Sequence, residues 1–431
     1  MTDFRFIHAA DLHLDSPLDH LRSLDAQTAS RVAAASRRSV ETIVATAIER
    51  EVSALVIAGD LFDGPVRDAS AALWIDSQFR RLNDAGVEVI LIRGNHDSLS
   101  NASRSVKWSR GVYELGAESA TSHVIDSCGL AVHGQSFGAR AVLDNIAASY
   151  PEAFDGYFNL GLLHTSLSGT SGHDTYAPTS IDVLEGRGFD YWALGHIHQR
   201  TQASLSSRCW IGFSGNTQGR HIRESGPKGC NLVHVQNRAI ANVEFIATDS
   251  VRWFDVELDI SKLESLSELA ELAGAACEQF SPEQHSCGKS DRHVAIRLRL
   301  TGAAPLHASL AGLTVRQRIA EAVSVLLREM GSLWLETVKI QTRAPAMRQQ
   351  RGDCELPLGT LQEIVKDIHS EPNLQKQLMK SLEDLGRKAR GALSATDWQL
   401  WNETDQSREF ARLLDQAEQL LGAWVVEDSV Q

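Results

Sequence analysis

The chain has 431 residues, of which 43% are hydrophobic and 23% are charged, so it is too long for one ordinary domain and too apolar to be disordered. Its formal net charge of −13 argues against wholesale coating of a polyanion, although metals and local basic patches can still hold a nucleic acid. No apolar run is long enough to cross a membrane and the first residues lack the pattern of a signal peptide, so we expect a cytoplasmic protein without membrane attachment.

The first 248 residues alternate short apolar runs with helical patterns, which is typical of a layered α/β domain. Phe4–Ala10 and Val52–Ala58 predict buried strands, and the stretch between them, from about Leu18 to Arg50, predicts a helix that can be broken in two. A further helix is predicted from Asp68 to Ala85, and a third strand follows at Val87–Ile92.

Later runs of the same domain predict the rest of the sheet. They are a hairpin of Thr121–Asp126 and Leu130–His133, strands at Phe158–Leu163 and Tyr191–Leu194, and closing strands within Gly229–Phe245. The segment Ser166–Thr179 is rich in Ser, Gly and Thr and predicts a long loop, which is either a substrate lip over the site or a plain connection. Gly212–Asn216 predicts a turn in which glycine supplies unusual backbone angles.

A boundary is expected near residues 248–251, because the pattern then changes to a small α+β unit over residues 251–343. Its predicted elements alternate strand and helix: Arg252–Asp259, Leu263–Phe280, His293–Leu300, Val315–Met330 and Leu333–Ile340. A polar stretch at 343–353 separates this unit from an acidic, helical tail over residues 354–431. The tail either forms a helical hairpin that packs on itself or on the body, or it docks a partner helix or coiled coil.

Polar residues that can bind metals follow five of the predicted strands. They are Asp11 and His13, Asp60, Asn95, His164, and His196 with His198. Ligands of open α/β sheets bind at the carboxyl ends of strands, so we expect these side chains to meet at one site. Residues two apart in extended chain point to the same side, which applies to the pairs Asp11/His13 and His196/His198.

Seven nitrogen and oxygen ligands exceed the needs of one ion and predict a pair of divalent ions, with Asp60 as the natural bridging carboxylate. Mixed imidazole and carboxylate ligands favour Mn, Fe or Zn over Ca. Two such ions about 3.5–4 Å apart polarise phosphoryl oxygens and acidify a water, which predicts phosphoester hydrolysis.

The residues beside the ligands predict supporting roles. His96 follows Asn95 and would point beside the metals, where it can stabilise charge or protonate the leaving oxygen. We expect Asp97 to orient His96 or a ligand histidine, and Asp63 to orient His13 or His198.

Two groups of basic residues are candidates for contacts with a nucleic-acid backbone. Arg104, Lys107 and Arg110 share one face of a short predicted helix, which is either a solvated face or a phosphate contact. The segment 200–230 contains several basic residues against only Glu224, and forms the best candidate for a backbone-binding wall; the basic residues are Arg200, Arg208, Arg220, Arg223 and Lys228.

The six cysteines are scattered and none forms a CxxC pair, so free reduced thiols are expected. Cys277, His285 and Cys287 lack a fourth ligand and the spacing of a zinc finger.

The motifs DLH, GDLFDG, RGNHDS, LLHTSL and ALGHIHQR together resemble the calcineurin-like metallophosphoesterase superfamily. Within it they are most similar to SbcD-type DNA repair exonucleases, and the stretches FIHAADLHLDSPL and YAPTSIDVLEGRGFDYWALGHIHQR resemble the bacterial YhaO branch. The resemblance implies a four-layer α/β/β/α sandwich followed by a small α+β capping domain, with the helical C-terminal tail beyond it.

The resemblance also implies the assignment of the site. One Mn ion would be held by Asp11, His13, Asp60 and His198, and the other by Asp60, Asn95, His164 and His196. His96 would be the catalytic histidine. The implied partners are DNA and an SMC-like coiled-coil ATPase subunit, and a homodimer is a further expectation.

The chain departs from its relatives at Asp63, where archaeal and eukaryotic members carry a histidine that helps at the phosphate. This leaves exonuclease and endonuclease activity both open. The leading hypothesis is a Mn-dependent DNA exonuclease or phosphodiesterase acting in DNA repair. One alternative is a metallophosphatase or a cyclic-nucleotide phosphodiesterase on the same site. The phosphatase is disfavoured because Asp63 is not followed by Arg-Gly. Another alternative is an adaptor that recruits a partner through its tail.

Overall fold

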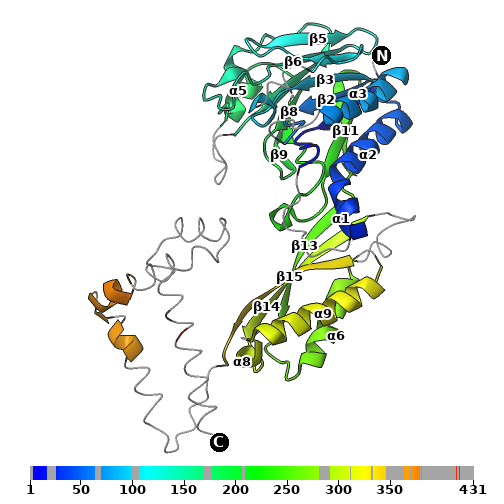
Figure 1. Ribbon diagram of the computed structural model, residues 1–431. Coiled ribbons are helices and arrows are strands. Elements are labelled where there is room, and N and C mark those ends of the chain that lie inside the picture. Colours follow the sequence, from blue (N-terminus) through cyan, green and yellow to red (C-terminus); the bar gives the residue numbers. More distant parts are fainter. Residues whose placement is uncertain are drawn as a thin grey trace, which may run out of the picture. The chain divides into compact units, whose positions relative to one another are not determined.

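The computed structural model (Figure 1) describes most of the chain up to residue 345 and parts of the tail. The described residues are 3–16, 26–63, 69–99, 106–167, 176–205, 209–280, 292–310, 312–331, 333–345, most of 364–380, and 414 and 417. The chain divides into two compact units, the first built on residues 1–255 with 277–297 and 327–336, and the second on 256–276, 298–326 and 337–431.

The first unit contains two six-stranded sheets. The first sheet has the order β12-β11-β1-β2-β3-β4, in which β1 to β4 run parallel and β11 pairs antiparallel to β1. Its strands are β1 (Asp3–Ala9), β2 (Ala54–Ala58), β3 (Glu88–Ile92), β4 (Val112–Glu114), β11 (Gly229–Gln236) and β12 (Ala239–Ala247). The closing strands predicted within Gly229–Phe245 are therefore confirmed as β11 and β12.

The second sheet has the order β5-β6-β7-β8-β10-β9, with β6, β7, β8 and β10 parallel. Its strands are β5 (Thr121–Ile125), β6 (Leu130–Gly134), β7 (Phe158–His164), β8 (Tyr191–Gly195), β9 (Thr201–Leu205) and β10 (Trp210–Phe213). The predicted hairpin is confirmed, because β5 and β6 pair antiparallel.

Alternating side chains of the strands divide the apolar core into layers. Phe6, Val56 and Ile90 pack with Leu160 and Tyr191 of the other sheet in one buried cluster, so the two sheets face each other. The residues between them in sequence, such as Ile7 and Ile57, point the other way, as the twofold repeat of a strand requires.

Helices cover the outer face of each sheet (Figure 1). The first sheet packs against α2 (Ala35–Glu49) and α3 (Ala69–Asp84), with α1 (Ala26–Ala33) before them. The second sheet packs against α5 (Ile181–Glu185) and the short 3-10 turn η2 (Ile146–Ser149), through Leu184, Trp192 and Leu194. The predicted four-layer α/β/β/α sandwich is thereby confirmed.

The chain after residue 250 forms a three-stranded sheet of order β13-β14-β15 with helices. Its elements are β13 (Val251–Asp259), α6 (Leu266–Glu278), β14 (His293–Ala303), α8 (His307–Leu310), α9 (Leu313–Glu329) and β15 (Leu333–Arg343). The order strand, helix, strand, helix, strand is the predicted one, and α8 is an addition.

Some predictions fail or lie outside the described residues. Lys107 and Arg110 do not share a helix face, because residues 106–110 are non-helical and lead into β4, which pairs with β3. Arg104, the zinc candidates His285 and Cys287, and most of the tail are outside the described part. Of the tail, the described residues between 364 and 380 are mostly helical. Within the described part, no helix has the length and apolar character needed to span a bilayer.

Candidate metal centre

The predicted ligands lie where parallel strands of the two sheets end. Asp11 follows β1, Asp60 follows β2, Asn95 follows β3, His164 ends β7 and His196 follows β8. The chain after β1 continues beside the chain after β2, because the backbone N–H of Asp11 donates to Gly59 O at 3.1 Å and that of His13 donates to Asp60 O at 3.1 Å. The site is therefore held by backbone pairing that extends past the strands.

Four of the predicted ligands adopt left-handed backbone conformations that non-glycine residues rarely take. Their φ angles are 51° for Asp11, 44° for His13, 52° for Asp60 and 100° for His196. Each such residue costs of order 1–3 kcal/mol, and such residues cluster at functional sites. The surrounding packing must hold these backbone conformations in place. The packing is tight at Gly94, where an added Cβ would lie 2.8 Å from both Asp60 N and His164 Cε1.

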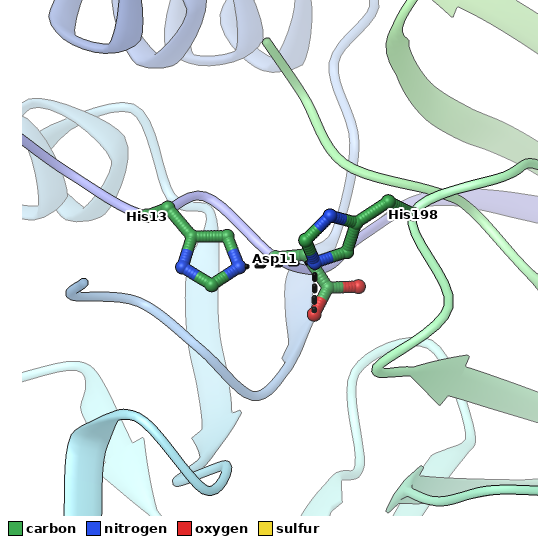
Figure 2. Close-up of side chains that lie close together, drawn as sticks. All are labelled: Asp11, His13 and His198. Carbon is green, nitrogen blue, oxygen red and sulfur yellow. Dashed lines mark hydrogen bonds and ion pairs between the residues drawn. The ribbon is translucent and has the colours of Figure 1, made fainter. Parts of the chain in front are cut away.

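The first group of side chains consists of Asp11, His13 and His198, which lie close together in Figure 2. The Nε2 atoms of His13 and His198 are 3.1 Å apart, and His198 Nε2 is 4.0 Å from Asp11 Oδ1. Asp60 belongs to the same neighbourhood, because its Oδ2 is 3.8 Å from His13 Nε2. These ligand atoms converge from the ends of β1, β2 and β8.

The second group consists of Asp60, Asn95 and His164. His164 Nε2 is 2.9 Å from Asn95 Oδ1 and 3.5 Å from Asp60 Oδ2. Asp60 thus lies between the two groups, as a bridging carboxylate would. The ring centroids of His196 and His164 are 5.3 Å apart. The backbone N–H of His196 donates to both carboxylate oxygens of Asp11, at 3.0 and 3.1 Å.

Two ring nitrogens, one of His164 and one of His198, present bare lone pairs to the centre. His164 Nδ1 lies 2.9 Å from Ala58 O, which can only accept, so Nδ1 carries the proton and Nε2 is bare toward Asn95 Oδ1. His198 Nδ1 likewise donates to Glu224 Oε1 at 2.7 Å, so its Nε2 is bare toward His13. Bare imidazole nitrogens that converge with carboxylate and amide oxygens form a donor set suited to divalent cations, and the residues therefore fit a metal pair.

The pKa values of the central groups support the same conclusion. Burial lowers the pKa of His164 to about 3 and that of His13 well below its usual value, so both rings are neutral ligands. Burial raises the pKa of Asp60 to about 6, and burial together with the Asp60 charge raises the pKa of Asp11. Carboxylates forced together in a dry site resist ionisation until a cation offsets their charge.

His96 lies at the edge of this centre and is held by two acidic groups. Its Nδ1 is 3.2 Å from Asp63 Oδ1, and its backbone N–H donates to Asp60 Oδ1 at 2.9 Å. Asp63 raises the pKa of His96, which favours the protonated ring. Its side chain is 37% exposed. It also falls within 4.8 Å of ligand atoms of His13 and Asp60, so its proton is within reach of a group bound at the centre.

Asp63 has the position that the sequence predicts, behind His13. Its Oδ1 is 3.2 Å from His13 Nδ1, although the ring N–H is not aligned for a hydrogen bond. Burial alone would raise the pKa of Asp63, but the His13 and His96 rings and the Ser16 hydroxyl, which donates at 2.7 Å, lower it. Asp63 is therefore an ionised carboxylate that serves two histidines.

Asp97 makes backbone contacts that the sequence did not predict. Its carboxylate accepts hydrogen bonds from the backbone N–H groups of Phe62 at 2.8 Å, Gly94 at 3.0 Å and Leu61 at 3.1 Å. These bonds tie the loop after β3, which contains Asn95, to the loop after β2, which contains Asp60. Asp97 therefore holds together the chain that carries two predicted ligands, and its predicted role of orienting a histidine stays a prediction.

Glu224 is a site residue that the sequence did not predict. It lies in the 3-10 turn η3 (Ile222–Glu224), and its carboxylate accepts from His198 Nδ1, from Asn216 Nδ2 at 2.8 Å and from the Arg220 backbone N–H at 2.7 Å. The one available signal is that it is the single acidic residue in the basic segment 200–230.

The described basic candidates divide into exposed residues and residues that contact other side chains or the backbone. Lys107 and Arg223 are exposed. Lys228 is buried and donates to His198 O at 2.9 Å, and Arg200 donates to Asn231 Oδ1 at 2.8 Å. Arg220 lies 3.3 Å from both Asp63 Oδ1 and Glu224 Oε1. Two basic residues of the segment 200–230, Arg220 and Lys228, therefore contact residues of the predicted metal centre.

Replacing Glu224 with glutamine should weaken metal binding or hydrolysis by about 10–100-fold, because the charged acceptor that orients His198 is lost. Isothermal titration of metal-free protein with Mn measures this effect. The matched control is Glu244→Gln, on β12 and away from the site. Equal metal affinity in Glu224→Gln and wild type would show that His198 needs no such support.

Comparison with known proteins agrees with this geometry. The family model of calcineurin-like phosphoesterases matches residues 4–200, and that of the middle domain of metallophosphoesterase YhaO matches residues 253–343. The metallophosphoesterase YhaO of Bacillus subtilis (strain 168) is 37% identical over 308 residues, which cover 71% of this chain and 73% of that protein.

More distant similarities extend the comparison. The DNA double-strand break repair protein Mre11 of Haloferax volcanii is 27% identical over 315 residues, 65% of each chain. A dimetal phosphatase from Danio rerio, known from its crystal structure, is 12% identical with a TM-score of 0.36, covering 55% of this chain and 94% of that one.

Proposed function

This chain belongs to the calcineurin-like metallophosphoesterases, in their YhaO branch, and from that membership we propose that it is a Mn-dependent DNA nuclease. The family makes it a metal-dependent phosphoester hydrolase. The observation that carries the proposal is the convergence of bare imidazole nitrogens and carboxylate oxygens from five strand ends on one buried centre.

We assign the ligands in two overlapping sets. One metal would be held by Asp11, His13, Asp60 and His198. The other would be held by Asp60, Asn95, His164 and His196. Two divalent cations at such a centre polarise the phosphoryl oxygens and acidify the attacking water.

The protein side chains supply orientation and a proton. Ala58 O and Glu224 fix the tautomers of His164 and His198, so that Nε2 of each ring faces the centre. His96, whose pKa is raised by Asp63, holds a proton that it can give to the leaving oxygen of the substrate. Asp97 keeps the loops of Asp60 and Asn95 in register.

DNA is the proposed substrate for two reasons. Two further relatives are named for the repair of DNA double-strand breaks. Lys107 and Arg223 are exposed cations that can contact phosphates outside the centre, and Arg104 is a further candidate outside the described residues. Cleavage of the DNA backbone by two-metal hydrolysis then fits a role in DNA repair.

A nuclease assay tests the proposal. Protein with confirmed Mn content should shorten linear duplex or single-stranded DNA, whereas Asp60→Asn protein should not. Labels at either end would report the polarity of degradation and separate exonuclease from endonuclease activity. Absence of cleavage by the metal-loaded wild type would refute the nuclease proposal.

The same assay separates the second candidate, a metallophosphatase or a cyclic-nucleotide phosphodiesterase. The pair Asp63 and His96, 3.2 Å apart, supplies a proton donor that serves a small ester equally well. Turnover of a phosphomonoester or a cyclic nucleotide, with DNA left intact, would favour this candidate.

We propose that the tail of residues 354–431 recruits a partner, such as an SMC-like ATPase with a coiled coil or a second copy of this chain, in the cytoplasm. Deleting these residues should abolish partner binding in a pull-down and leave Mn-dependent hydrolysis of a model phosphodiester within about twofold of wild type, since no predicted ligand lies there. Retained binding after the deletion would locate the partner surface elsewhere.

A further inference from the structure

Two carboxylates support the histidines of the first ligand group from outside. Asp63 lies 3.2 Å from the Nδ1 atoms of both His13 and His96. Glu224 accepts from Nδ1 of His198 at 2.7 Å. The two acids come from different parts of the sandwich, since Asp63 follows β2 of the first sheet and Glu224 lies between β10 of the second sheet and β11.

Arg220 links these two carboxylates. One terminal nitrogen of its guanidinium is 3.3 Å from Asp63 Oδ1, and the other is 3.3 Å from Glu224 Oε1 and 3.4 Å from His198 Nδ1. Its backbone N–H also donates to Glu224 Oε2 at 2.7 Å. One residue therefore contacts both acids, through side chain and main chain.

The geometry shows that Arg220 is shared between the acids and not committed to one of them. Arg297 pairs with Glu336 at 2.7 and 2.8 Å, and Arg252 pairs with Asp249 at 2.7 and 2.8 Å, each on a single carboxylate. The contacts of Arg220 are longer, because each acid also accepts from a histidine or hydroxyl.

The positive charge of Arg220 offsets the negative charges of Asp63 and Glu224. The Glu224 side chain is 7% exposed and that of Asp63 is 19% exposed. Buried carboxylates close to one another repel, and each is costly to keep ionised without a cation. The ionised Glu224 keeps the Nδ1 proton of His198 on its own side and the Nε2 lone pair toward the metal, and Asp63 lies against the Nδ1 atoms of His13 and His96.

The main chain around Arg220 is fixed independently of the metals. Gln218 Oε1 accepts from the Ser250 backbone N–H at 2.9 Å, and Gln218 Nε2 donates to Val251 O at 2.6 Å. Trp253 Nε1 donates to Gly219 O at 2.9 Å. The guanidinium thus projects from a segment that is anchored to the start of β13.

We propose that Arg220 is a positioning residue, which clasps Asp63 and Glu224 and thereby sets the metal affinity of the group Asp11, His13 and His198. This replaces the expectation that Arg220 contacts the DNA backbone. The inference rests on the proposed metal pair and names the residue that makes one half of it rigid.

Metal binding by three variants tests the proposal. Arg220→Met keeps the aliphatic stem and removes the charge, Arg220→Lys keeps the charge, and Arg223→Met is the matched control from the same turn. Titration of the metal-free full-length chain with Mn should show one of two sites weakened by about 10–100-fold in Arg220→Met, a smaller loss in Arg220→Lys, and none in Arg223→Met.

A double-mutant cycle assigns the effect to one half of the centre. In a His198→Ala background, which already lacks a ligand of the first group, Arg220→Met should cause no further loss of Mn affinity. In a His164→Ala background the full loss should remain. Circular dichroism of each variant confirms that the fold is retained, and Arg220→Lys carries the test if Arg220→Met does not fold.

Three outcomes would overturn the inference. Unchanged Mn affinity in Arg220→Met with a raised KM for DNA would make Arg220 a phosphate contact. Equal losses in the His198→Ala and His164→Ala backgrounds would show a general electrostatic effect. Unchanged Mn affinity and unchanged KM would leave Arg220 without a role in the centre. In each case, binding of two Mn ions by the wild type would leave the proposed function standing. A wild type that binds no Mn would instead refute the metal pair on which that function rests.

Discussion

Replacing His96 with asparagine should lower the turnover of a phosphodiester by about 10²–10⁴-fold, the usual contribution of a general acid or base, and leave metal content unchanged. The reason is the position of the ring. Its Nδ1 lies against Asp63, and the surrounding acids favour the protonated form. Asparagine can still accept or donate a hydrogen bond, but it cannot deliver a proton to a leaving oxygen.

The measurement combines steady-state kinetics on a model diester with metal analysis of the same sample. His123→Asn is the matched control, because His123 lies on β5, an edge strand of the second sheet, where it pairs with Glu88 of β3 outside the centre. For a substrate with a good leaving group, such as nitrophenolate, His96→Asn should lower the turnover far less. Loss of metal together with activity would instead identify His96 as a metal ligand. Its position near His13 and Asp60 would be consistent with that role.

Replacing Asp97 should destabilise the protein in proportion to the backbone donors left without a partner. Alanine leaves three buried N–H groups unpaired, at about 1–3 kcal/mol each, which is a large part of a typical stability of about 5–15 kcal/mol. Asparagine can keep the acceptor that serves Leu61 and Gly94 and lose only the bond from Phe62. The expected order of stability is wild type, Asp97→Asn, Asp97→Ala.

Hydrogen exchange of the metal-free protein measures this locally, in the peptides around residues 59–63 and 92–97. Both should exchange faster in Asp97→Ala, because both loops share the carboxylate. Asp144→Ala, at an exposed position, serves as control. Faster exchange in only one of the two peptides would show that Asp97 does not couple the loops.

The sequence predicts the strand ends well, because buried strands and the polar residues after them are contiguous in the chain. Asp11 and His13 follow β1 within four residues of its end, and Asp60 follows β2 within two. Parallel pairing then brings these ends together without further information. The layered α/β class of the domain follows from this local rule, whereas the four-layer sandwich, which brings the strand ends of the two sheets together, was implied by the resemblance to the family.

Other features depend on contacts between distant segments, which spacing cannot show. Glu224 meets His198 across 26 positions, and Asp97 bonds to residues 35 and 36 positions earlier. Both acids look ordinary in sequence, since one stands in a basic run and the other beside His96. Their tasks are set by how the loops fold back over the sheet edges.

Short strands were also missed, for a related reason. β4 has three residues and β10 has four, too few to show a repeat, and Gly212 within β10 favoured a turn. The helix predicted for Lys107 and Arg110 failed because Trp108 and Ser109 bond to Glu114 and Asp76, which holds that stretch extended toward β4. Tertiary pairing here outweighs the threefold spacing of the basic residues.

Anomalous scattering from crystals grown with Mn is the most direct measurement of the centre. The expected result is two peaks about 3.5–4 Å apart, with the Asp60 carboxylate between them, His13 and His198 beside one, and Asn95 and His164 beside the other. A single peak, or none, at these side chains would contradict the two-metal centre from which the proposed hydrolysis follows.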